Sequence, residues 1–259
     1  MSTPEPFVNV SRDDRGVVRL ELNRAQAFNA LSRDMLSALQ HELDALAHDE
    51  SLRVLVISAT GKAFCAGHDL REMRNSPSMD FYQALFSQCS HMMMSLRRLP
   101  VPVMAQVDGI ATAAGCQLVA MCDLAVATRT SKFAVSGVNL GLFCATPSVA
   151  LSRNVSQKAA FEMLVTGDFI SAEQALAKGL INAVTEPQAL AAEIERLIER
   201  ILAKPRVGIA MGKSLFYQQL EMPIEAAYQS AEQTMACNMM DATALEGVQA
   251  FIDKRPPNW

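Results

Sequence analysis

Apolar and polar residues alternate along the first part of the chain in a pattern that predicts a β-hairpin. Residues 7–10 and 17–22 alternate in strand fashion on either side of a polar turn at 13–16. After a polar loop, Ser32 precedes apolar residues spaced three and four positions apart, which predicts a helix capped by that serine. A β-branched run at 54–58 predicts the next strand.

The centre of the chain, residues 103–128, combines a strand, a tight turn, a helix and a second strand. Its apolar run breaks at Asp108-Gly109 and passes through small residues into an apolar stretch, 114–121, that predicts a short buried helix. The first N–H groups of a helix have no intrahelical partner, and the small side chains up to Gly115 let a ligand approach them. Such a helix start binds a phosphate or a carbonyl oxygen that is becoming negative. The alternative is an ordinary tight connection of an α/β protein.

The last third of the chain is almost entirely helical in pattern. A change in composition near residue 190 divides the chain into an α/β core at 1–190 and a helical region at 191–259. The methionines of this helical region fit either packing in the core or contact with another subunit.

Composition and charge limit the classes of function. A net charge of −4 gives no reason to expect nucleic acid or an anionic membrane as partner, and no apolar run has the length of a membrane span. The six cysteines contain no CxxC pair and are typical of reduced core residues, so we expect a cytoplasmic protein. His41, His48 and His91 lack the spacing of metal ligands, and we expect no metal site.

Two loops have the features of one composite site. Gly67-His68 and residues 113–115 each follow a predicted strand and open a helix. If the two strands are neighbours in one sheet, both helix starts lie at the same sheet edge. Two backbone N–H groups that converge on one oxygen form an oxyanion hole, in which each donor contributes about 3–4 kcal/mol.

Several segments resemble the crotonase (enoyl-CoA hydratase/isomerase) superfamily, in the same order along nearly the whole chain. They are Asn23-Arg24 with Asn29-Ala30-Leu31, residues 62–70 (KAFCAGHDL), Val107-Asp108-Gly109, residues 114–118 (AGCQL), Cys122-Asp123, residues 164–180 and residues 251–255 (FIDKR). The resemblance implies a ββα spiral core, C-terminal helices that mediate trimers or dimers of trimers, and an acyl-CoA thioester as ligand. Coenzyme A is then part of the substrate, and no separate cofactor is expected.

The same resemblance assigns site residues by their motif positions. It implies that the thioester oxygen accepts hydrogen bonds from the N–H groups of His68 and Ala114; family members often have Gly at the second position. The positions that it places against coenzyme A or the acyl group are Arg24, Ala25, Lys62, Ala66, Arg71, Gly115, Cys144, Phe251 and Lys254. Each basic residue among them also fits a solvated surface charge.

The sequence departs from the family at its two catalytic positions. Enoyl-CoA hydratases use two glutamates, and here Gln117 and Gly137 stand at those positions. A glutamine side chain holds water but does not exchange a proton near neutral pH, and glycine has no side chain to contribute.

Two side chains are candidates to replace the missing groups, each with a structural alternative. His68 titrates near neutral pH but also fits a packing role. Cys144 lies in a loop without a visible base, which is typical of an inert thiol. Asp69 has the position of a residue that caps a helix, and Asp123 that of a residue that stabilises a turn or the backbone. The sequence therefore predicts an acyl-CoA enzyme of crotonase type with weak or altered activity, or alternatively a non-catalytic acyl-CoA-binding or scaffolding protein.

Overall fold

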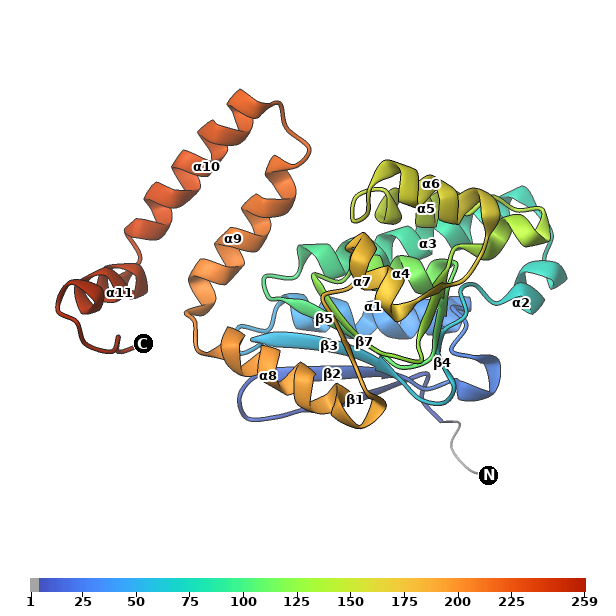
Figure 1. The fold of residues 1–259 in the computed structure, drawn as a ribbon, viewed down its shortest axis with the longest axis horizontal. Helices are drawn as coiled ribbons and strands as arrows, with labels where there is room; N and C mark the ends of the chain where they lie inside the picture. The colour runs from blue at the N-terminus through green and yellow to red at the C-terminus, as the bar shows by residue number, and fades with distance from the viewer. Residues whose placement is uncertain (1–4) are drawn as a thin grey trace.

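The computed structural model describes residues 5–259 and contains two sheets surrounded by helices (Figure 1). The larger sheet has six strands in the order β1-β2-β3-β5-β7-β10. Their bounds are β1 Val8–Arg12, β2 Val17–Leu22, β3 Val54–Ala59, β5 Val103–Val107, β7 Leu124–Thr128 and β10 Ala183–Thr185. β1 and β2 form the predicted antiparallel hairpin, and each later pair of neighbours is parallel.

Helices cover both faces of this sheet, as its apolar strands require. Successive residues of β3 point to opposite faces. Leu55 and Ile57 pack in a cluster that includes side chains of α1 (Arg33–Ala47) and α3 (Met79–Arg98). Val54 and Val56 pack on the other face, against α8 (Leu190–Leu202).

The second sheet has four short strands, and one of them belongs to the central segment 103–128. Its order is β4-β6-β8-β9, with bounds β4 Ala63–Cys65, β6 Ile110–Thr112, β8 Lys132–Ala134 and β9 Ile170–Ser171. The sequence predicts only a turn at residues 109–113 and not β6, because three residues are too few for a strand pattern. Gly109, at φ +84°, connects the two sheets, and a Cβ there would lie 2.2 Å from the carbonyl oxygen of Lys62.

The remaining helices of the core are short. They are α2 Leu70–Asn75, α4 Ala114–Met121, α5 Ala145–Leu151, α6 Gln157–Thr166 and α7 Ala172–Lys178. Ser32 caps α1 by accepting a hydrogen bond from the Met35 N–H, as predicted. α5 begins at Ala145 and contains Pro147 in its first turn, where proline is tolerated.

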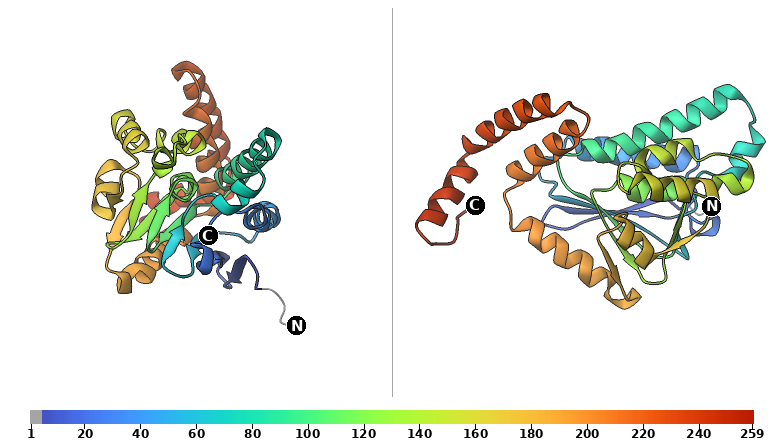
Figure 2. Two further views of the ribbon diagram at one scale, coloured as in Figure 1. Left: turned by 90° about the vertical axis from the view of Figure 1, so that its right-hand side faces the viewer. Right: turned by 45° about the horizontal axis from the view of Figure 1, so that its top comes forward.

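Three C-terminal helices extend away from the core, as Figures 1 and 2 show. They are α9 Arg206–Gln219, α10 Ile224–Met239 and α11 Ala242–Ile252. Large apolar side chains on α10, α11 and their flanks are exposed: Ile224, Tyr228, Met235, Met240, Leu245, Phe251 and Ile252. Within residues 5–259, no helix has the length and apolar character needed to cross a membrane.

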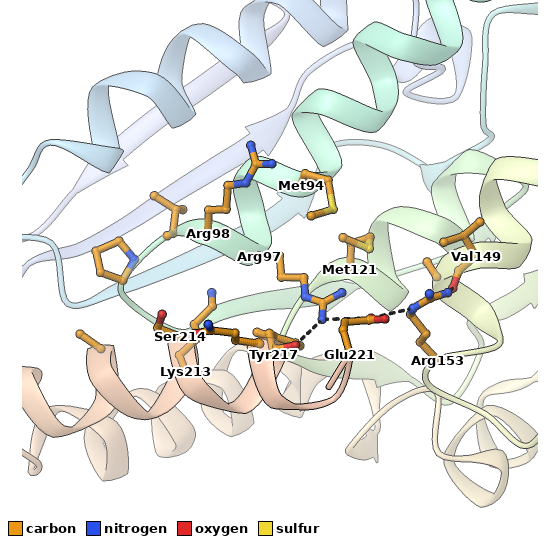
Figure 3. A pocket seen from close by; sticks show the side chains of 15 residues that line it. Met94, Arg97, Arg98, Met121, Val149, Arg153, Lys213, Ser214, Tyr217 and Glu221 are labelled. Atoms are coloured by element: carbon orange, nitrogen blue, oxygen red, sulfur yellow. Dashed lines mark hydrogen bonds and ion pairs between the residues drawn. The ribbon is translucent and has the colours of Figure 1, made fainter. Parts of the chain in front are cut away.

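A buried ion pair attaches α9 to the core. Lys213 Nζ lies 2.7 Å from Asp123 Oδ2 and also donates to the carbonyl oxygens of Leu96 and Val101. Asp123 accepts from the Val103 N–H, in line with its predicted role as a backbone partner, and from the hydroxyl of Tyr217. In Figure 3, Lys213 and Tyr217 extend from α9 toward the core. Neither partner of Asp123 was predictable from the sequence, because both lie about 90 positions away along the chain.

Candidate active site

The loops at Gly67-His68 and 113–115 are in direct contact. They follow β4 and β6, which are parallel neighbours in the smaller sheet, so both loops lie at one edge of it. A Cβ on Gly67 would lie 3.2 Å from the backbone nitrogen of Ala114, and a Cβ on Gly115 would lie 2.0 Å from the carbonyl oxygen of Cys65. This confirms that the strands before the two loops are neighbours, although they are β4 and β6 rather than the predicted strands β3 and β5.

Two free backbone N–H groups lie near helix starts: His68 precedes Asp69, the N-cap of α2, and Ala114 is the first residue of α4. The N–H groups of His68 and Ala114 donate to no backbone or side-chain acceptor in the part of the chain that the structure describes. Ala113, which precedes the second group, has φ 51° and ψ −120°, a conformation that strongly favours glycine. An alanine held in this conformation stores strain of about 1–3 kcal/mol, which is typical of functional sites.

A cavity of about 260 Å³ lies beside the two loops. Its lining comes from the loops themselves, from α2 and α3, and from the segment 136–147: Ala66, His68, Leu70, Met73, Phe86, Ala113, Ala114, Ser136, Gly137, Leu140, Leu142, Phe143, Cys144, Ala145, Thr146 and Pro147. None of these side chains is a carboxylate, an ammonium or a guanidinium. Any acid–base chemistry of lining side chains therefore falls to His68 or Cys144.

His68 is held as a neutral ring. Its Nδ1 lies 3.3 Å from the carbonyl oxygen of Leu31, which selects the tautomer with the proton on Nδ1. Its ring packs against Phe86 at a centroid distance of 5.4 Å, and its Nε2 is buried and unpartnered among the described residues. Burial lowers the pKa of His68, and the hydrogen bond to Leu31 only partly opposes this shift.

Gly137 and Cys144 are in contact with one another. The Gly137 N–H donates to Cys144 Sγ at 3.3 Å. A Cβ on Gly137 would lie 2.4 Å from the carbonyl oxygen of Leu142 and 2.7 Å from Cys144 Sγ. Gly137 does not have a positive φ, so contact distance rather than backbone conformation restricts this position. Burial raises the pKa of the Cys144 thiol, which keeps it protonated and a poor nucleophile.

Gln117 lies one turn into α4 and is buried. Its side chain is 5% exposed, and its Oε1 atom has no hydrogen-bond partner among residues 5–259. It does not belong to the side chains that line the cavity. An unpaired buried amide oxygen is costly and marks a position where a donor from a ligand or water would be stabilising.

The candidate coenzyme A residues divide into two groups. Arg24 pairs with Asp69 at 2.7 Å, and Asp69 caps α2 as predicted. Burial tends to raise the pKa of Asp69, but the hydrogen bond from Arg24 and those from backbone N–H groups lower it overall. Lys62 and Arg71 are exposed on the same loops, with Ala25 beside Gly61.

Phe251 and Lys254 lie far from these residues. Phe251 belongs to α11, and Lys254 follows this helix in the sequence. Figure 1 shows α11 at the opposite end of the molecule from α2. Within one chain they therefore do not reach the cavity.

A larger groove, of about 660 Å³, lies between α3, α5 and α9. Three of its charged groups pair with one another: Glu221 lies 3.8 Å from Arg97 and 3.2 Å from Arg153, and Arg97 stacks over the Tyr217 ring (Figure 3). These pairs connect structural elements, and the smaller cavity with the two free amides is the better candidate for chemistry.

Fold and site together define a protein of the crotonase class, and comparison with known proteins gives the same result. The enoyl-CoA hydratase/isomerase family matches residues 12–259, and the chain belongs to this family. A crystal structure of an enoyl-CoA hydratase from Mycobacterium smegmatis is 63% identical, with a TM-score of 0.98 over 98% of this chain and 99% of that one.

Within the family, the sequence around residues 66–70, 111–118 and 141–147 also resembles the branch of enoyl-CoA hydratase domain-containing protein 3. The mouse protein of that name, described as mitochondrial, is 45% identical over all of this chain and 86% of its own length. The crystal structure of the human protein has a TM-score of 0.93 at 43% identity, over 98% of this chain and the whole of that one. The predicted family, branch and α/β fold are confirmed.

Most of the cavity wall was not predicted from the sequence. Met73, Phe86, Leu142 and Phe143 come from helices and a loop whose apolar residues are typical of any core. The apolar residues at 140–143 differ from ordinary core residues only in being exposed to solvent, and this exposure is known only from the structure.

Proposed function

We propose that the chain binds acyl-CoA thioesters, with the thioester oxygen between the N–H groups of His68 and Ala114. The observation that carries this proposal is that His68 and Ala114, whose backbone N–H groups are unpaired among the described residues, line the same apolar cavity. In a site shielded from water, such donors stabilise the negative charge that a thioester oxygen gains when its α-carbon becomes an enolate.

The chemistry that follows is a crotonase-type lyase or isomerase reaction of weak or altered activity. Gln117 and Gly137 occupy the positions of the two family glutamates. The contact of Gly137 with the Leu142 carbonyl leaves no space for a carboxylate side chain at that position without movement of the loop. Polarisation of the thioester remains, while efficient proton transfer to or from the substrate is lost.

Coenzyme A would lie along the loops that carry Arg24, Lys62 and Arg71. Phe251 and Lys254 would then come from another copy of the chain in a homotrimer or a dimer of trimers. The exposed apolar side chains of α10 and α11 support such an assembly, because a patch of this kind is rarely left in water. Light scattering should give a mass at least three times the 28.2 kDa of the chain, and a monomer at micromolar concentration would exclude the assembly.

The test of ligand binding is calorimetry with a series of acyl-CoA thioesters, combined with removal of one donor. In Ala114→Pro the donor is absent, and proline is well tolerated as the first residue of a helix. Gln157→Pro is the matched control, since Gln157 begins α6 outside the cavity. We expect weaker binding for Ala114→Pro only; no affinity of the wild-type chain for any thioester would exclude the proposal.

A second candidate is a non-catalytic acyl-CoA-binding or scaffolding protein. The uncharged lining of the cavity favours it, because no carboxylate is present there to activate water. Binding without turnover of any enoyl-CoA or its isomers would support this candidate over the enzyme.

A further inference from the structure

The walls of the cavity restrict the chemical class of the acyl group. Apart from His68, the lining side chains are aliphatic or aromatic, or carry a thiol or hydroxyl group. The neutral form of His68 is favoured because its ring is buried beside Phe86, and the hydrogen bond to the Leu31 carbonyl oxygen only partly opposes this effect. A carboxylate that enters such a cavity loses its hydration without gaining a cationic partner.

The volume of the cavity restricts the length of the acyl group. A protein cavity of about 150 Å³ holds benzene, which corresponds to about 25 Å³ for each carbon. On that scale the 260 Å³ beside the two loops holds about ten heavy atoms. The carbonyl carbon, its oxygen and the sulfur take three of them, which leaves space for about seven more carbons.

Two of the large apolar lining side chains, which we call the inner wall, are only partly exposed. Met73 of α2 and Phe86 of α3 are partly buried and pack against the main hydrophobic cluster. The outer lining is different: Leu70, Leu140, Leu142 and Phe143 are 53%, 66%, 46% and 47% exposed. An acyl chain in the cavity would therefore meet a fixed inner wall and a more open apolar rim.

We propose that the site selects uncharged, apolar acyl thioesters with about six to eight acyl carbons, and that Met73 and Phe86 set this limit. The inference rests on the proposed function, because it assumes that the thioester oxygen is bound at His68 and Ala114. It adds the class and length of the acyl group to that function.

The test is calorimetry with saturated thioesters from acetyl-CoA to palmitoyl-CoA and with succinyl-CoA. Affinity should rise roughly fourfold with each methylene up to about eight carbons and then stop rising. Succinyl-CoA has the same number of acyl carbons as butyryl-CoA and should bind at least tenfold more weakly. If no thioester binds, the proposed function fails. Binding that ignores length, or that favours succinyl-CoA, overturns only the selectivity inferred here.

Variants of the inner wall test the limit itself. Met73→Ala removes three heavy atoms from the wall and should move the optimum to a chain longer by two or three carbons. Met79→Ala is the control, because Met79 is 71% exposed and lies outside the cavity lining. Phe86→Leu serves as a second enlargement if Met73→Ala folds poorly. An unchanged optimum in a folded enlarged variant would overturn the role of this wall.

Discussion

The Nζ atom of Lys213 and the Oδ2 atom of Asp123 lie 2.7 Å apart and connect the C-terminal helices to the end of the helix that begins at Ala114. The Lys213 side chain is only 7% exposed, and its three N–H groups have three acceptors. Lys213→Met removes the cation and leaves the carboxylate without its charged partner. We expect a loss of about 3–5 kcal/mol in the free energy of unfolding, measured by urea denaturation.

The control variant for this loss of stability is Lys178→Met, which removes the more exposed ion pair between Lys178 and Glu162. Its effect should be several times smaller, because solvent and side-chain entropy weaken surface pairs. Equal losses in the two variants would show that the buried pair contributes no special stability.

Ala113→Gly is expected to stabilise the chain. Glycine adopts φ 51° and ψ −120° without the strain of about 1–3 kcal/mol that alanine has there. Its greater freedom in the unfolded chain costs about 0.4–1 kcal/mol, so a net gain of about 1 kcal/mol remains. Ala113→Val should have the opposite effect, and thermal and urea unfolding of both variants measure it. A glycine variant less stable than the wild type would argue against strain at this position.

The stability of the chain should depend on His68 in mildly acidic solution. Because burial lowers the pKa of His68, the unfolded chain binds a proton at a higher pH than the folded chain does. Stability therefore falls as the pH decreases through the ordinary histidine range near 6.5, by at most about 1.4 kcal/mol per pH unit for one proton. Unfolding measured at pH 7.5 and 5.5 should show a smaller decrease for His68→Gln than for the wild type. The same decrease in both would exclude His68 as its source.

The architecture and the centre of the site were predictable because both depend on local sequence. The β-hairpin, the Ser32 cap and the helix at 114–121 follow from periodicity and capping residues within a few positions. The convergence of Gly67-His68 and Ala114 needed one additional assumption, that two strands are neighbours, and the structure confirms it.

The features that were missed depend on contacts between distant parts of the chain. No local pattern connects Asp123 to Lys213, and the three residues of β6 carry no strand periodicity. The restriction at Gly137 comes from the Leu142 carbonyl and Cys144, which a single sequence does not place in space.

The most direct test of the proposed weak or altered activity is hydration of crotonyl-CoA. Water addition needs a base and an acid, whose assistance contributes typically about 10²–10⁴-fold, so we expect hydration that is absent or several orders of magnitude below that of an ordinary family hydratase. A fully active wild type would show that another group, with His68 the first to test, supplies the proton transfer.

Restoring a carboxylate should raise this rate only where the chain has space for it. Gln117→Glu replaces a buried amide by a group of the same length. Because the Gln117 side chain does not line the cavity, the variant should increase hydration only if the new carboxylate turns toward the cavity, with initial rates measured for the folded variant. Combined with Gly137→Glu it would supply both family carboxylates and increase the rate further if the loop at 142–144 moves. The 2.4 Å contact with the Leu142 carbonyl opposes that movement, so we expect the double variant to be less stable than Gln117→Glu and no faster.

Gly137→Ala separates the effect of this contact from the effect of the carboxylate, since it introduces the contact without a carboxylate. A stable double variant that exceeds Gln117→Glu in rate would show that the loop adapts and that only the missing carboxylates limit hydration.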